Sequence, residues 1–280
     1  MKKTAAQSNI RFKMNITLTR IPAKREAAPH IALIHGMGSA ATAWKPLTPR
    51  LLNHFNVITV DLPGHGESAF TKGQAMDPAS IAEQVVHQIE NEFGLTKFDL
   101  VGNSWGGWIA LEMAANFPKH ISSVTALAPA GFWLASYVQR APGTATLQFL
   151  AKNSAVLAPR YLKFEWARKI GFEDVSPHWR SFTYELCLDA TKAMANSKGY
   201  FPAWDGMLGK RFDSRIDKDI PVKIIFGDAD NTLPATTCQE RAMAPEHSQW
   251  ITLTKCGHAP MWDNVETVAD HILDIAGIKR

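Results

Sequence analysis

The sequence predicts an α/β protein whose mostly parallel central sheet is flanked by helices and interrupted by a helical insert. Short apolar runs closed by glycine, at 30–36 and 56–64, are typical of strands buried on both faces of a parallel sheet. Strand patterns alternate with helical patterns along the first 130 residues, which indicates βαβ units. The alternation stops after Gly131 and resumes only near residue 217.

The first half of the chain follows this alternation element by element. Residues 76–94 predict a helix, because Asp77 can cap it, Pro78 suits its first turn and Gly94 ends it. Its apolar residues recur every four positions and so share one face. Around this helix we expect strands at 9–21, 30–36, 56–64, 97–104 and 122–131, and a second helix at 105–117.

The segment 131–216 has a different character. It is helix-like, carries 15 of the 27 aromatic residues, and has 12 Lys/Arg against 7 Asp/Glu. The sheet pattern, each strand with the loop that follows it, resumes at 220–234 and 248–260, and 264–277 predicts a closing helix. We therefore expect one sheet domain, residues 1–130 and 217–280, interrupted by a helical cap or lid at 131–216.

Composition excludes several classes of protein. The formal charge of the 280-residue chain is +4, and its basic residues are spread along the sequence, so nucleic-acid binding is not expected. Cys187, Cys238 and Cys256 are widely separated, which argues against a disulfide framework and against a zinc site. We expect no metal and no organic cofactor.

The sequence also bears on location. No apolar run approaches the roughly 18 residues that a membrane span requires. The opening 1–15 is basic, but polar residues interrupt any apolar core of a signal peptide. We expect a cytoplasmic protein that acts on a small molecule; nothing in the sequence indicates its oligomeric state.

One turn carries the strongest chemical signal. In "DLVGNSWGGWIALEMAA", residues 99–115, Ser104 lies between Gly102 and Gly106, after a strand pattern and before a helical one. A chain that reverses so sharply needs small neighbours, and it exposes the serine oxygen at a helix N-terminus. The alternative is a glycine-rich turn with a capping serine. The strand before it and the helix after it favour a nucleophile.

A nucleophilic serine needs a base and an orienting acid. His258 follows the last predicted strand, and it alone among the histidines combines that position with the chain order Ser, Asp, His. Asp228 and Asp230, after the preceding strand, both qualify as the acid on position. The loop after the strand at 122–131 offers none, because no Asp or Glu occurs at 113–164.

Five motifs in order resemble those of the α/β-hydrolase fold family of serine hydrolases, on both sides of the insert. They are "HGMG" at 35–38, "DLPGHGES" at 61–68, "GNSWGG" at 102–107, "GDADNTLP" at 227–234 and "GHAPMWD" at 257–263. The resemblance implies that Asp230 is the acid of a Ser104–His258–Asp230 triad. It also implies that the backbone N–H groups of Met37 and Trp105 form the oxyanion hole.

The substrate is less constrained. An aromatic insert above a serine suggests an apolar pocket, and we expect Phe132 and Trp133 to line it. A small, largely apolar ester is the expected substrate. The motif "GNSWGG", with Asn103 before the serine, also resembles that of the carbon–carbon bond hydrolases of ring-cleavage pathways. The anionic substrates of that subgroup would suit Arg140, Arg160, Arg168 or Arg180. The turn "HGMGSA", however, departs from the subgroup's pattern.

Two remote alternatives belong to other classes. "GMGSAA" at 36–41 matches a dinucleotide-binding fingerprint, and Asp61 ends the next strand, as such a unit requires. Pro46 and Pro49, however, interrupt the helix that this fingerprint needs. The second alternative is a ligand receptor with the same fold and no catalytic activity. The loss of a triad residue would favour it, but no triad residue is missing, so the sequence does not support it.

Overall fold

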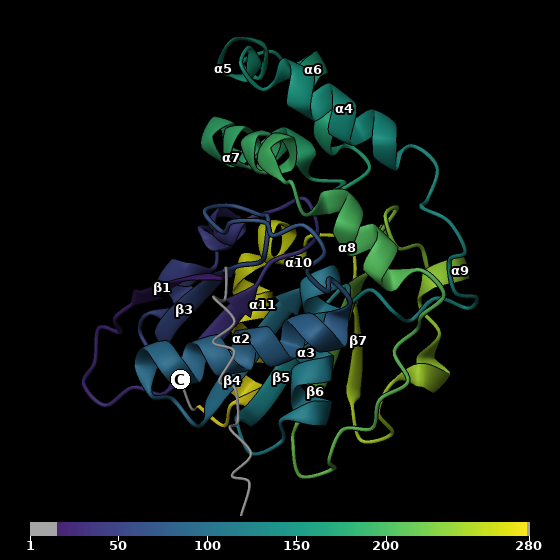
Figure 1. Ribbon diagram of the computed structural model, residues 1–280. Helices are drawn as coiled ribbons and strands as arrows, with labels where there is room; N and C mark the ends of the chain where they lie inside the picture. The colour runs from purple at the N-terminus through teal and green to yellow at the C-terminus, as the bar shows by residue number, and fades with distance from the viewer. Residues whose placement is uncertain (1–15, 279–280) are drawn as a thin grey trace, which may run out of the picture.

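The computed structural model describes residues 16–278, and it confirms the predicted fold class. A seven-stranded sheet with the order β1-β3-β2-β4-β5-β6-β7 forms the centre of the molecule (Figure 1). The strands are β1 (Thr17–Ile21), β2 (His30–Ile34), β3 (Asn56–Asp61), β4 (Phe98–Asn103), β5 (Ile121–Leu127), β6 (Val222–Gly227) and β7 (Gln249–Leu253).

Six of these strands run parallel, and only the edge strand β1 pairs antiparallel, with β3. The strand order changes direction between the neighbours β2 and β4. The chain passes from β2 to β3 on one side of this point, and from β4 to β5 and β6 on the other. The loops after β2 and β4 therefore diverge at the carboxyl edge of the sheet, where parallel α/β folds place their ligand sites.

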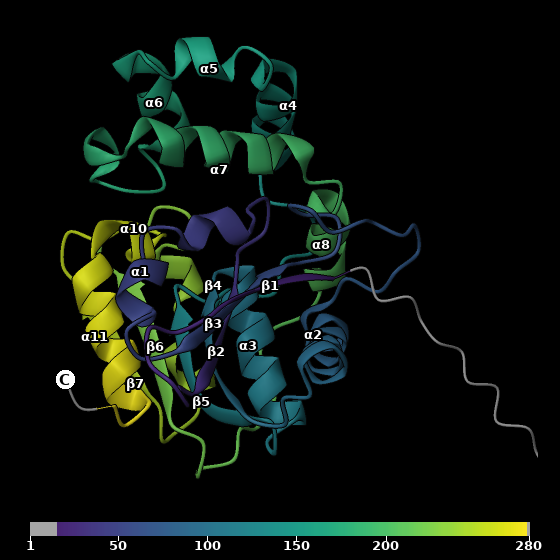
Figure 2. The same cartoon turned by 90° about the vertical axis from the view of Figure 1, so that its left-hand side faces the viewer.

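Helices cover both faces of the sheet (Figure 2). On one face lie α2 (Pro78–Phe93) and α3 (Trp105–Asn116), and on the other lie α1 (Thr48–Leu51) and α11 (Val265–Ile275). The α2 helix begins as its sequence predicts, with Asp77 accepting a hydrogen bond from the Ser80 N–H, and it ends at the left-handed Gly94. Its buried residues, which include Ile81, Val85 and Ile89, belong to the apolar core on this face of the sheet, and the helix packs against α3.

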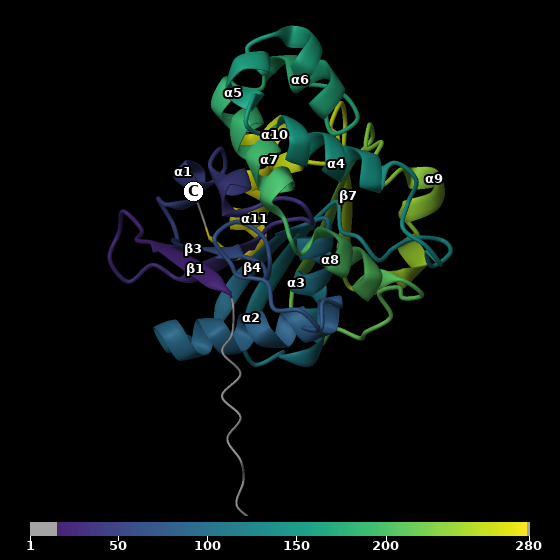
Figure 3. The same cartoon turned by 45° about the horizontal axis from the view of Figure 1, so that its top comes forward.

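The segment between β5 and β6 holds α4 (Thr144–Ser154), α5 (Ala158–Tyr161), α6 (Glu165–Phe172), α7 (Tyr184–Asn196) and α8 (Tyr200–Met207). In Figure 2, α7 lies above the sheet domain, and α4, α5 and α6 lie on the far side of α7. Figure 3 shows the same helices above the end of the sheet near α10 (Pro260–Asp263). The segment has a small core of its own, which includes Phe172, Trp179 and Phe182.

Some expectations differ from the structure in extent. The segment after β2 forms a 3-10 turn at Ala41–Trp44 and then the four-residue α1, where a dinucleotide fold would have a long helix. Of the strand expected at 9–21, residues 9–15 lie outside the described residues, as does the opening 1–15. The helices of the described part, residues 16–278, include none with the length and apolar character needed to cross a bilayer.

Candidate active site

Ser104 occupies a strained turn between β4 and α3. Its backbone has φ 57° and ψ −120°, a conformation that L-residues rarely adopt. Three hydrogen bonds hold it there: its N–H donates to the Leu127 carbonyl (2.9 Å), and its carbonyl accepts from the N–H groups of Trp108 (3.1 Å) and Ala130 (2.9 Å). The side chain is only partly buried, so the turn presents the hydroxyl at the surface of a rigid scaffold.

The glycines beside Ser104 are required by close backbone contacts. A Cβ on Gly102 would lie 2.1 Å from the carbonyl oxygen of Gly106, and a Cβ on Gly106 would lie 2.2 Å from that of Ile34. Such distances are far shorter than any real carbon–oxygen contact. Strand β4, helix α3 and strand β2 therefore approach this closely only because residues 102 and 106 lack side chains.

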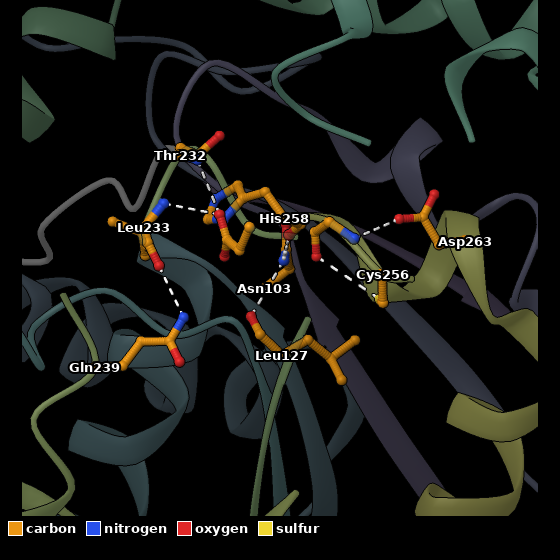
Figure 4. Close-up of polar contacts among 10 residues, drawn as sticks. Asn103, Leu127, Thr232, Leu233, Gln239, Cys256, His258 and Asp263 are labelled. Carbon is orange, nitrogen blue, oxygen red and sulfur yellow. Dashed lines mark hydrogen bonds and ion pairs between the residues drawn. The ribbon is translucent and has the colours of Figure 1, made fainter. Parts of the chain in front are cut away.

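His258 and Asp230 form a buried pair. His258 Nδ1 lies 2.9 Å from Asp230 Oδ2, and the other carboxylate oxygen accepts from the N–H groups of Thr232 (2.9 Å) and Leu233 (2.7 Å). Figure 4 shows His258 beside these two residues. Burial alone would raise the pKa of Asp230, but the charge of His258 and these hydrogen bonds outweigh it and lower the pKa. The carboxylate is thus ionised at neutral pH.

Asp228 and Asp230, which both qualified as the acid by their positions in the sequence, lie in different surroundings. Asp230 is buried and contacts His258, whereas Asp228 is exposed and accepts a hydrogen bond from the Cys256 N–H (3.3 Å). The geometry accordingly gives Asp230 the contact that an orienting acid needs.

Asn103 joins the serine turn to the histidine loop. Its side-chain amide donates to the carbonyl of His258 (3.0 Å) and to that of Leu127 (3.1 Å), as Figure 4 shows. Within the described residues the Ser104 hydroxyl makes no hydrogen bond, and the link from the serine turn to the histidine loop runs through the neighbouring Asn103. Catalytic hydrogen bonds in ligand-free sites are often long and tighten only when substrate binds.

The histidine loop is also held from outside the sheet domain. The His258 N–H donates to the Val175 carbonyl (2.7 Å), in the segment between β5 and β6. Asp263 accepts from the Gly257 N–H (2.7 Å) and from the Ser176 hydroxyl. A Cβ on Gly257 would lie 2.2 Å from the Val175 carbonyl oxygen, so the contact depends on this glycine.

Gly36 and Ser104, the residues that precede Met37 and Trp105, lie close together. Trp105 is the first residue of α3, where a helix leaves its N–H unpaired. Met37 follows Gly36, whose added Cβ would lie 3.1 Å from the Ser104 Cβ. Among the described residues neither backbone N–H donates to another protein group. Both groups are thus available to an external acceptor.

Phe132 and Trp133 lie inside the packed core. Phe132 is fully buried against Phe212 and Trp250, with ring centroids 5.6 and 6.0 Å away. Trp133 packs on Trp108 at 5.4 Å and donates its indole N–H to the Lys210 carbonyl. These are contacts of core residues, and they give no support to the substrate-binding role predicted for the two.

Two buried histidines near the serine have structural partners. His35 accepts from the Leu62 N–H (3.0 Å), and its other ring nitrogen lies 2.7 Å from the Gly36 carbonyl. Burial lowers the pKa of His35 to about 4 and that of His65 to about 3. Both are therefore neutral at pH 7, and they join the turns after β2 and β3 by hydrogen bonds and ring packing.

Sequence reasoning missed the roles of Asn103, Val175, Ser176 and Asp263. Asn103 and Asp263 lie inside the motifs at 102–107 and 257–263, and this position was the only sequence signal for their roles. Their partners lie 155 residues away for Asn103 and 87 residues away for Asp263. No local spacing indicates such contacts.

Comparisons with known proteins bear on the family and the fold. The sequence model of the alpha/beta hydrolase family matches residues 31–271. Monoacylglycerol lipase ABHD6 of Mus musculus is 27% identical over 270 residues, which cover 88% of this chain and 75% of that protein. A pimeloyl-[acyl-carrier protein] methyl ester esterase of Neisseria meningitidis is 28% identical over 251 residues, covering 87% and 92% of the two chains.

Solved structures show the same fold. An esterase from Thermogutta terrifontis aligns with a TM-score of 0.66 at 19% identity, covering 92% of each chain. A meta-cleavage product hydrolase from Pseudomonas fluorescens aligns with a TM-score of 0.67 at 17% identity, covering 94% of each chain. At this level of identity the likeness concerns the architecture alone.

Proposed function

The chain belongs to the alpha/beta hydrolase family, as its motifs predicted, and from this premise we propose that it hydrolyses carboxylic esters through Ser104, His258 and Asp230. The observation that carries the proposal is a strained, partly exposed serine whose turn is linked through Asn103 to the loop of a histidine held by a buried carboxylate. Relatives named for monoacylglycerol and methyl ester hydrolysis support the class of bond cleaved.

The proposed reaction begins when His258 takes the proton of the Ser104 hydroxyl through Nε2 as the oxygen attacks the ester carbonyl. The oxyanion of the tetrahedral intermediate accepts hydrogen bonds from the backbone N–H groups of Met37 and Trp105. Such a donor is worth about 3 kcal/mol of transition-state stabilisation. Because both donors are backbone groups, the side chains at 37 and 105 can vary without loss of this function.

The intermediate collapses when the protonated His258 gives its proton to the departing alcohol, which leaves an acyl group on Ser104. His258 then removes a proton from water, the resulting hydroxide attacks the acyl-enzyme, and the acid is released as the proton returns to Ser104. Throughout, Asp230 Oδ2 accepts from the Nδ1–H of His258. This contact fixes the tautomer and stabilises the imidazolium that forms in each half-reaction.

We further propose that residues 131–216 act as a cap over this site and that the substrate is small and largely apolar. The position of α4–α7 above the strand ends supports the cap (Figure 3). The bond from the His258 N–H to Val175 supports it too, because it makes the cap a direct neighbour of the proposed base.

We favour ester hydrolysis over the carbon–carbon bond alternative because three of the four arginines considered for an anionic substrate already have partners. Arg140 pairs with Asp205 and Arg180 with Glu165, while Arg168 donates to the Phe182 carbonyl. Asn103, which suggested that alternative, has a structural contact with His258 instead.

A cytoplasmic location is part of the proposal. The three cysteines are all free and buried, which suits a reducing compartment.

The experiment that tests the activity is labelling with a fluorophosphonate probe, together with turnover of short p-nitrophenyl esters, in wild type and Ser104→Ala. We expect the wild type to be labelled and active and the variant to lose both properties. Labelling without ester turnover would redirect the search to carbon–carbon bond cleavage. An unlabelled wild-type protein would contradict the proposed nucleophile.

A further inference from the structure

The large apolar side chains exposed on this molecule are confined to one region. All ten of those found in the described residues lie within 134–170, and none lies in the sheet domain. They are Leu134, Val138, Leu147, Phe149, Leu150, Val156, Leu157, Phe164, Trp166 and Ile170, with exposed fractions from 46% to 87%. Monomeric proteins rarely gather so many exposed apolar side chains without a binding partner.

Most of these side chains belong to what we call the outer helical layer, residues 144–172 with α4, α5 and α6. The layer packs on α7 and faces away from the sheet (Figure 2). Helix α4 buries none of its residues, and α6 buries only Ala167 and Phe172. Trp166 and Ile170, four positions apart, share the free side of α6.

The same region holds the positive charge of the protein. Residues 134–172 contain six Lys/Arg and one acidic residue, Glu165, which is paired with Arg180. The rest of the chain has 24 Lys/Arg against 25 Asp/Glu, so the excess lies entirely here. Lys152, Arg160 and Lys163 are exposed and have no ion-pair partner in the part of the chain that the structure describes.

We propose that the outer helical layer docks on an anionic lipid surface. Apolar side chains interspersed with lysine and arginine suit the boundary between headgroups and acyl chains, where the cations meet phosphate and tryptophan is favoured. Docking in this orientation turns the carboxyl edge of the sheet, with Ser104, toward the lipid.

The charge distribution favours lipid over a second copy of the chain. A symmetric dimer through this layer would place the same positive patch opposite itself. Repulsion between unpaired cations such as Lys152, Arg160 and Lys163 would oppose that contact, whereas anionic headgroups would neutralise them.

Vesicle co-sedimentation tests the proposal. The protein carries Ser104→Ala, so that lipid hydrolysis plays no part and the result is independent of the proposed activity. We expect binding to phosphatidylcholine vesicles with about 30 mol % phosphatidylglycerol, and at least about tenfold weaker binding to phosphatidylcholine alone. Binding to the anionic vesicles should weaken in about 0.5 M salt, because that concentration screens the headgroup charge.

Variants separate the apolar and the charged contributions. Trp166→Ser with Ile170→Ser should weaken binding to both vesicle types by about tenfold. Lys152→Glu with Lys163→Glu should weaken binding to anionic vesicles alone. The matched control is Lys218→Glu, whose lysine is 85% exposed in the turn before β6, at the other end of the sheet, and it should reduce anionic binding less than either patch lysine changed singly.

Three outcomes would overturn the proposal. One is a protein that sediments with neither vesicle. A second is undiminished binding by Trp166→Ser with Ile170→Ser, provided that its melting temperature matches the parent. The third is a wild-type dimer in size-exclusion chromatography that this double variant converts to a monomer, since the layer would then be an interface between copies.

Discussion

The side-chain amide of Asn103 donates a hydrogen bond to the backbone carbonyl of His258, 155 residues further along the chain, at 3.0 Å. Asn103 precedes Ser104 directly, so one side chain ties the proposed nucleophile's turn to the proposed base's loop. The same amide also donates to Leu127 at 3.1 Å, which links the loop to strand β5. Reactions of this type are sensitive to displacements of about 1 Å between the reacting groups.

Asn103→Ala should therefore lower kcat for a p-nitrophenyl ester by about 10- to 100-fold while KM changes little. The His258 carbonyl loses the Asn103 donor and the Leu127 carbonyl is left with the Ser104 N–H, so the free energy of unfolding should also fall by about 1–3 kcal/mol. Asn116→Ala is the matched control, because its amide also donates to a backbone carbonyl, that of Glu112, but far from the loop. Asn116→Ala should lose stability and keep kcat. An Asn103→Ala protein with full kcat would contradict the positioning role of Asn103.

Asp230→Asn should reduce kcat/KM by roughly ten-thousandfold, because an amide in place of the carboxylate favours the wrong imidazole tautomer. Asp228→Asn should change it by less than about fivefold, since Asp228 is exposed and, among the residues that the structure describes, its carboxylate accepts a hydrogen bond from the Cys256 N–H alone. Steady-state kinetics on the two variants decide the assignment. The reverse ranking would transfer the acid role to Asp228.

Ser104→Ala and His258→Ala should each lower kcat by several orders of magnitude, and the double variant should cost little more than either alone. In the proposed mechanism the two residues take part in the same proton transfer, so the loss of either one already abolishes it and the loss of the second adds little. Single-turnover assays of the three proteins measure this coupling. Additive losses would mean that the residues act independently.

Gly106→Ala should destabilise the protein by about 3 kcal/mol or more, because the new methyl would meet the Ile34 carbonyl oxygen at 2.2 Å. Gly171→Ala is the control: this glycine lies in α6 with nothing within 4 Å of an added Cβ. It should raise stability by about 0.5–1 kcal/mol through helix propensity. Urea unfolding of both variants tests the contrast, and equal effects would contradict the close packing of α3 on β2.

Asp99 should make stability depend on pH between about 4 and 6. Burial raises the pKa of this carboxyl to about 6, against the lowering effect of the hydrogen bond from Ser123. In that range the folded state holds a proton that the unfolded state has lost, so the free energy of unfolding falls as pH rises, and it stays lower above about 6.

In Asp99→Asn this loss should disappear. The stability of the variant relative to wild type should therefore rise by about 1–2 kcal/mol between pH 4.5 and pH 7.5. Any intrinsic cost of the amide is present at both values and cancels in the comparison. Urea unfolding at the two values measures it, and a parallel pH profile for the two proteins would exclude Asp99 as the group responsible.

The sequence by itself determined the layered fold and the chemical character of the turn at Ser104. Apolar runs closed by glycine, and helices with a capping residue such as Asp77, are local patterns whose physical causes lie within a few residues. The glycines at 102 and 106 belong to the same class, because a sharp turn restricts its own neighbours whatever surrounds it.

Only the tertiary structure decided which distant groups meet. It placed Asp230, and not Asp228, against His258, and it buried Phe132 and Trp133 in the core. It also left the large exposed apolar side chains within residues 134–170, most of them in the outer helical layer. The reason is physical, because hydrogen bonds and burial depend on distances in space. Asp230 and His258 are 28 residues apart in the sequence, and Asn103 and His258 are 155 apart. Local sequence patterns do not encode contacts between residues so far apart.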